Sequence, residues 1–226
     1  MNNLLHITAS VAFAIALISC APEASMEKVD LDNSSLAPVI DHSEETVTLG
    51  EFVAWCANRK NRLAKEKTIS DIRYNLTYLP TETMAFIELR NEKYDFEKFR
   101  KVCEGYTEMV YFKFRIEALE GSGELLKYDL RSSSEYESRV RYLSFDMQMD
   151  LFLVQGSDTI SPGLYHFERA YGVAPYATVM LGFSRNQLNS RKEFTVVFND
   201  RLFDKGFIKF NYADGQIINL PNISGL

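Results

Sequence analysis

The chain of 226 residues has a formal net charge of −6, and its charged residues are unevenly distributed. Residues 21–46 contain seven acidic residues and one lysine, so the other 24 acidic and 24 basic residues balance. A balanced body argues against a nucleic-acid partner, which requires a basic domain. The cysteines and histidines lack the spacing of a metal site, and no phosphate-binding loop is present, so we expect neither a metal nor a cofactor.

The chain begins with an apolar segment, Leu4 to Ser19, that contains no charged residue. As a helix it would be about 24 Å long, which is short for a hydrocarbon core about 30 Å thick. This length is typical of the apolar region of a secretory signal peptide. We therefore expect residues 1–19 to be a signal peptide that is removed.

The end of this segment, Leu17-Ile18-Ser19-Cys20, resembles the lipobox of bacterial lipoproteins. The resemblance implies cleavage before Cys20, a diacylglycerol thioether on its sulfur, and acylation of the new amine, with palmitate as a typical chain. Two or three acyl chains give a firm membrane anchor. The resemblance also implies a cell-envelope location, and Ala21, which lacks the Asp that often retains lipoproteins at the inner membrane, favours the outer membrane. An ordinary signal peptide or a short buried segment is the alternative.

Residues 20–46 are expected to form a flexible acidic tether behind the lipidated cysteine. Pro22, Pro38 and the pair Ser34-Ser35 occur there without apolar periodicity. As a flexible coil, this stretch would span about 25–31 Å. The remaining residues, 47–226, are enough for one core and are predicted to form a single domain.

The first part of this domain is predicted to contain helices. Thr48 and Glu51 have the spacing of a capping box, and helices are expected at 81–90 and, capped by Asp95, at 96–106. Residues 71–80 alternate in polarity, which indicates a strand. The basic run 58–67 is interpreted as a solvated helix end, with contact to anionic headgroups or glycolipid as the alternative.

From about residue 107 the apolar period changes to two, which indicates strands. One helical segment, with Ser134 and Glu137 as a capping pair, interrupts them, and Gly121-Ser122-Gly123 and Asp214-Gly215 are expected to be hairpin tips. The pattern predicts a β-rich α+β fold: an antiparallel sandwich or a partly closed barrel, with a few short helices mainly in the N-terminal half. The eight strand candidates are 108–119, 125–130, 145–154, 163–170, 178–184, 193–199, 206–212 and 216–220.

Two kinds of covalent modification are suggested inside the domain. Cys56 and Cys103 lie on the apolar faces of predicted helices, so they are either two buried thiols or the two halves of a disulfide. The tripeptide Asp158-Thr159-Ile160 resembles a bacterial O-glycosylation sequence, Asp followed by Ser or Thr and then an apolar residue. That resemblance makes Thr159 a candidate acceptor.

A histidine-dependent enzyme would have to use His166. On a strand, His166 and Glu168 share one face and could be half of an acid–base site. No Gly-x-Ser-x-Gly or HExxH motif accompanies them. We therefore predict no catalytic set, with a half-buried polar strand as the simpler interpretation of this segment.

These observations favour a membrane-anchored envelope lipoprotein with a non-catalytic binding or scaffold role. Its partner would be an envelope protein or a small apolar ligand, besides the membrane itself. The alternatives are an envelope hydrolase that uses His166 or paired carboxylates, and a lipocalin-like carrier with an aromatic-lined cavity. Segments 75–80 and 164–175 also resemble those of gram-negative envelope lipoproteins, a resemblance that implies no activity.

Overall fold

The computed structural model describes residues 38–226 except 91, 94, 121–122 and 169–173. The signal peptide, Cys20 and residues 20–37 of the tether lie outside the described residues, so the lipobox and the anchor stay predictions. None of the helices described is both long and apolar enough to cross a membrane.

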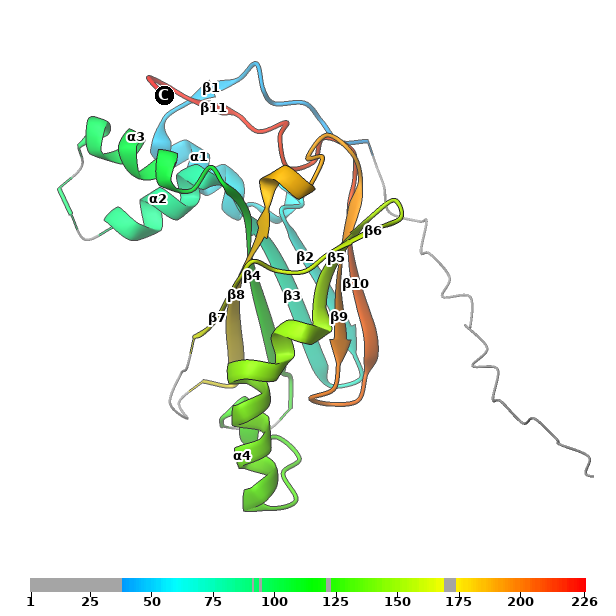
Figure 1. Ribbon diagram of the computed structural model, residues 1–226. Coiled ribbons are helices and arrows are strands. Elements are labelled where there is room, and N and C mark those ends of the chain that lie inside the picture. The colour runs from blue at the N-terminus through cyan, green and yellow to red at the C-terminus, as the bar shows by residue number, and fades with distance from the viewer. Residues whose placement is uncertain (1–37, 91, 94, 121–122, 169–173) are drawn as a thin grey trace, which may run out of the picture. The chain divides into compact units, whose positions relative to one another are not determined.

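The larger sheet has five antiparallel strands in the order β2-β3-β4-β8-β7 (Figure 1). The strands predicted around 71–80, 108–119, 163–170 and 178–184 are confirmed, whereas β2 replaces a predicted helix end. Three consecutive residues of this edge strand, Lys65, Glu66 and Lys67, are charged, and this concealed its alternation. The strands are β2 (Ala64–Ile69), β3 (Ile72–Leu79), β4 (Met109–Ala118), β8 (Tyr176–Ser184) and β7 (Leu164–Glu168).

The second sheet has four antiparallel strands in the order β10-β9-β5-β6, and a short parallel pair joins β1 to β11. Asp204 and Gly206 have φ of 58° and 73°, which allows the chain to turn between β9 and β10. Within the described ranges no sheet closes into a barrel. The strands are β5 (Leu151–Gln155), β6 (Asp158–Ile160), β9 (Phe194–Asp200), β10 (Gly206–Tyr212), β1 (Thr46–Val47) and β11 (Asn222–Ile223).

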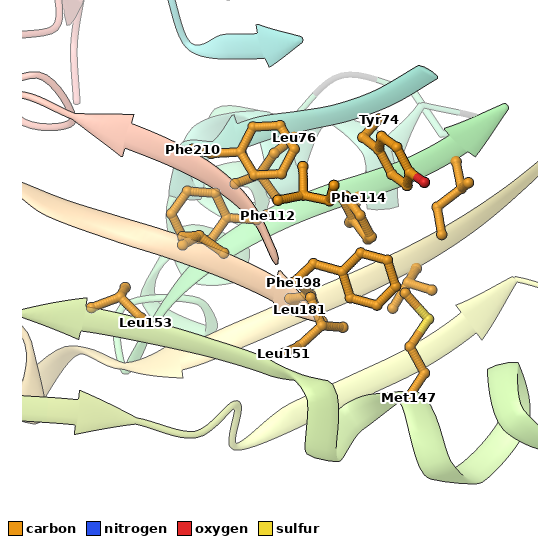
Figure 2. Packing of buried hydrophobic residues seen from close by; sticks show 14 of the residues in the cluster. Tyr74, Leu76, Phe112, Phe114, Met147, Leu151, Leu153, Leu181, Phe198 and Phe210 are labelled. Atoms are coloured by element: carbon orange, nitrogen blue, oxygen red, sulfur yellow. The ribbon is translucent and has the colours of Figure 1, made fainter. Parts of the chain in front are cut away.

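Aromatic side chains from both large sheets form one core (Figure 2). Phe114 of β4 meets Phe198 of β9 edge to face, with ring centroids 5.2 Å apart. Phe112 contacts Tyr212 in the same manner at 5.5 Å. Each such side chain stabilises the fold by about 1.5–3 kcal/mol through burial, and each ring pair adds about 0.5–1.5 kcal/mol.

Three helices surround a smaller apolar cluster that includes Phe52 and Phe99. They are α1 (Leu49–Ala57), α2 (Thr81–Leu89) and α3 (Phe96–Gly105), as predicted. The capping box of Thr48 and Glu51 is confirmed, and Asp95 caps α3 by accepting from the amide of Lys98 at 3.0 Å.

Among the described residues α1, α2 and α3 lie in the N-terminal half, but helices are not confined to it. α4 (Ser133–Arg141) continues as a π-helical turn, Tyr142–Asp146, and a 3₁₀ turn, Met147–Asp150. The predicted strand 145–154 therefore begins only at residue 151. Leu143 and Met147 are fully buried at helical spacing, whereas the alternation of residues 145–150 had mimicked a strand.

The N-cap of α4 is Ser132, which accepts from the amide of Glu135, and not Ser134. The predicted strand 125–130 contains a 3₁₀ turn, Leu125–Lys127, because Leu125 and Leu126 are both buried and cannot be so on an alternating strand with one exposed face.

Neither predicted hairpin tip joins paired strands. Gly215 has a φ of 71°, but it follows β10 and leads into further turns, so the predicted strand 216–220 is wrong as well. Buried Gln216, which hydrogen-bonds backbone groups, holds this segment in turns. Gly121 and Ser122 lie outside the described residues, and Gly123 leads toward a 3₁₀ turn instead of a strand.

Candidate functional site

The candidate catalytic residue His166 lies on β7, at one edge of the five-stranded sheet. His166 and Glu168 share the exposed face, as predicted, while Tyr165 and Phe167 pack against the core. Among the described residues, the imidazole of His166 has neither a hydrogen bond nor an ion pair. The structure thus brings no described acid, base or nucleophile into hydrogen-bond contact with its imidazole.

Two buried carboxylates, Asp150 and Asp200, lie at the ends of neighbouring strands. Asp200 accepts from the hydroxyl of Tyr74 at 2.5 Å and from the amides of Leu202 and Phe203 at 2.8 and 3.1 Å. All of these contacts are internal to the fold, so the Asp200 carboxylate is occupied by structural donors.

Asp150 is occupied in the same way. It accepts from the Tyr142 hydroxyl at 3.0 Å and the Asn199 amide at 3.2 Å, and it pairs with Arg201 at 2.9 Å. Burial, followed by the neighbouring carboxylate, raises the pKa of Tyr142 well above its usual range. Tyr74 and Tyr142 therefore stay protonated and donate to Asp200 and Asp150. These hydrogen bonds form a structural network.

Cys56 and Cys103 are not bridged in this structure. Cys103 is buried in the cluster between the helices, and Cys56 packs against the same cluster. Burial raises the pKa of Cys56 to about 12 and that of Cys103 to about 11, so neither is a thiolate at neutral pH. A bridge between them stays a prediction. Thr159 is exposed on the edge strand β6, and its glycosylation also stays a prediction.

Across the described ranges, no group of three or more His, Cys, Asp or Glu side chains is placed to hold a metal ion.

A pocket of about 330 Å³ lies where the chain first enters the described part of the protein. We call it the basic pocket. Its walls come from three segments that are far apart in sequence: residues 38–42, residues 55–62, and residues 216–219. The lining residues are Pro38, Val39, Ile40, His42, Trp55, Lys60, Asn61, Arg62, Gln216 and Asn219.

The first wall is held by backbone pairing with the C-terminal segment. The His42 amide donates to the carbonyl of Asn219 at 3.3 Å, and β1 pairs with β11 just beyond it (Figure 1). The His42 ring meets Trp55 edge to face, with centroids 5.2 Å apart. Residues 42–46, which the sequence analysis assigned to the end of the tether, thus contact the domain directly.

The second wall follows α1. Asn58 caps the C-terminal end of this helix, and a 3₁₀ turn, Arg59–Asn61, follows. The Asn61 amide donates to the carbonyl of Trp55 at 2.7 Å, which fixes the turn against the helix. Arg62 then adopts the left-handed conformation, with φ of 59°, and redirects the chain into β2.

The third wall is the turn after β10, where Gln216 is only 5% exposed. Its side chain donates to the carbonyl of Arg62 at 2.8 Å. Its oxygen accepts from the amide of Ala213 at 3.0 Å and from the ammonium of Lys65 at 3.2 Å. Gln216 therefore joins the second wall to the third.

The lysine and arginine side chains that line the basic pocket give its lining a positive charge. Its lining contains Lys60 and Arg62 but no Asp or Glu. Lys65 lies behind the lining, over the Tyr212 ring at 5.1 Å. Burial, and then the nearby charge of Arg62, lower the pKa of Lys65 to about 8. Beside the lining, Glu45 contacts the imidazole of His42 at 2.9 Å.

Sequence reasoning found part of this pocket. The basic run 58–67 was noticed and supplies three of the lining residues. Trp55 was missed, although it is the only tryptophan and lies off the apolar stripe of its helix, which was a usable signal. Residues 216–219 were assigned to a strand.

Comparisons of the chain with protein-family models, with curated proteins and with solved structures found no match.

Proposed function

We propose that this protein is a lipid-anchored envelope lipoprotein with a non-catalytic binding role. The observation that carries the proposal is the position of the basic pocket, whose first wall begins 18 residues after Cys20. A coil of that length spans about 21–25 Å, and a fully stretched chain about 60 Å. A protein anchored through Cys20 would therefore hold the first wall of the pocket at most about 60 Å from the bilayer.

Binding explains the polar groups better than hydrolysis does. A hydrolase needs an acid or base within hydrogen-bond reach of a nucleophile or water, in a cleft. Asp150 and Asp200 already accept from internal donors, and His166 is exposed without a described partner. The basic pocket instead offers an open concave surface with polar and aromatic groups.

The packing also favours a surface pocket over an internal cavity. We interpret the two large sheets as a sandwich, because Phe112, Phe114, Phe198 and Phe210 occupy the space between them (Figure 2). A lipocalin-like carrier would keep that space open for its ligand. We assign the binding role to the rim of the sandwich for this reason.

The proposed location is the outer membrane, which Ala21 favours. The test is fractionation of cells that produce the full precursor. We expect detergent, but not high salt, to release the wild-type protein, and Cys20→Ala to accumulate as an unprocessed or soluble form. Cys56→Ala is the matched control and should behave like the wild type. Normal retention of Cys20→Ala in membranes would overturn the anchor.

A further inference from the structure

We infer that the basic pocket binds an acidic saccharide, that is, a sugar that carries a carboxylate or phosphate group. This inference rests on the proposed binding role and names the ligand class. It draws on three properties of the lining: its charge, its aromatic surface and its amide groups.

The charge of the lining selects an anion. Lys60 is exposed at the pocket and forms no ion pair with any described carboxylate, and Arg62 lies two residues away. Lys65 adds a third positive charge behind the wall, held against Gln216. Because no carboxylate belongs to the lining, an anionic group entering the pocket meets only attraction from it.

The aromatic surface selects a ligand larger than an inorganic anion. Trp55 is half-buried, and its indole N–H has no hydrogen-bond partner among the described residues. A flat ring with a polar edge suits the C–H face and hydroxyls of a sugar. Val39 and the exposed Ile40 extend this surface at the entrance, with Ile40 69% exposed.

The amides supply the hydroxyl contacts. The side-chain oxygen of Asn61 and the whole side-chain amide of Asn219 form no hydrogen bond with a described residue, so both can serve a ligand. An amide donates and accepts, as the hydroxyls of a sugar require. The volume of about 330 Å³ falls in the range of small-ligand sites.

The single tryptophan makes the test specific, because its fluorescence reports on this pocket alone. The full lipidated protein in detergent micelles is titrated with glucuronate, glucose 6-phosphate, glucose and inorganic phosphate. We expect saturable changes with the two acidic sugars, and at least tenfold weaker binding of glucose and of phosphate. Equal binding of phosphate and of the acidic sugars would remove the saccharide from the account.

Lys60→Gln should weaken binding of both acidic sugars at least tenfold and leave the melting temperature unchanged, because Lys60 is exposed. Lys67→Gln, an exposed lysine of β2 outside the lining, is the matched control and should bind normally. Equal loss in both variants would show that net charge matters and the pocket does not.

Vesicles form the last arm. A response to phosphatidylglycerol vesicles without any response to acidic sugars would overturn the ligand class in favour of lipid headgroups. This failure is distinguishable from failure of the proposed function: if Cys20→Ala still leaves the membrane, the anchor stands and only the ligand is wrong.

Discussion

The two ends of the large sheets differ in whether their polar side chains have hydrogen-bond partners inside the fold. Near α4, the buried groups Asp150, Asp200 and Arg139 have partners inside the fold; Arg139, for example, donates to the carbonyl of Leu126 at 3.2 Å and to Glu135 at 2.7 Å. At the end that holds the basic pocket, the side chains of Lys60 and Asn219 have no described partner.

This difference distinguishes polar groups that stabilise the fold from polar groups that are available to a ligand. A buried polar group without a partner costs about 1–3 kcal/mol, so the partners of Asp150, Asp200 and Arg139 stabilise the fold. Groups at an open pocket are hydrated and avoid this cost until a ligand replaces the water. The end that contains Asp150, Asp200 and Arg139, here called the paired end, is thus expected to determine stability. The end that contains the basic pocket, here called the open end, is expected to determine binding.

The largest loss of stability is expected from a substitution at the paired end. Asp200→Ala leaves the Tyr74 hydroxyl and two backbone amides without their acceptor, and we expect it to lower the free energy of unfolding by about 3 kcal/mol or more. Denaturant titration measures this loss. Asp146→Ala, which breaks only an exposed ion pair with Arg141, should change stability by less than about 0.5 kcal/mol. Similar losses in both variants would contradict the account.

A smaller effect is expected from Gln216→Ala at the wall of the pocket. Gln216 is the one buried residue of the lining. Like the buried groups of the paired end, its side chain has partners inside the fold, because it forms hydrogen bonds with Arg62, Ala213 and Lys65. We expect a loss of about 1–2 kcal/mol in the free energy of unfolding, together with weaker saccharide binding. An unchanged melting curve would show that the walls of the pocket do not depend on this side chain.

A third prediction concerns the open end itself. Asn219→Ser shortens an amide at the pocket that has no described side-chain partner, so stability should change by less than about 0.5 kcal/mol. Binding of glucuronate, followed by Trp55 fluorescence, should weaken several-fold. A variant that loses stability but binds glucuronate normally would contradict this prediction, because Asn219 would then stabilise the fold and not contact the ligand.

The last prediction is a pH dependence from Lys65. Its pKa is about 8 in the folded protein and about 10.4 in an unfolded chain, so the unfolded chain binds more protons between these values. The free energy of unfolding of the wild type should therefore rise relative to Lys65→Gln as the pH increases from about 8 to about 10. Lys67→Gln provides the control, and a flat difference for Lys65→Gln would contradict the expected burial.

The sequence predicted those parts of the fold that local chemistry determines. Thr48 and Asp95 announce their helices because a cap needs only neighbouring residues. β2 was missed because its charges follow from its edge position, which only the complete sheet defines. Residues 145–150 were assigned to a strand because their polarity alternates, although they lie in a π-helical turn followed by a 3₁₀ turn.

The basic pocket was less predictable still. It needs the left-handed Arg62, the pairing of β1 with β11, and the turn that carries Gln216 to the same place. None of these long-range contacts is visible in a local pattern. The basic run 58–67 and the single Trp55 were the components visible in the sequence, and the interpretation of the run as a helix end was wrong because the helix ends at Ala57.

Hydrogen exchange tests the contrast between the two ends most directly. The full lipidated protein is compared with and without saturating glucose 6-phosphate. The account predicts slower amide exchange in residues 38–42, 58–62 and 216–219, and no change around Asp150 and Asp200. Protection confined to the paired end, or no protection in the three pocket segments under conditions where calorimetry shows binding, would contradict it.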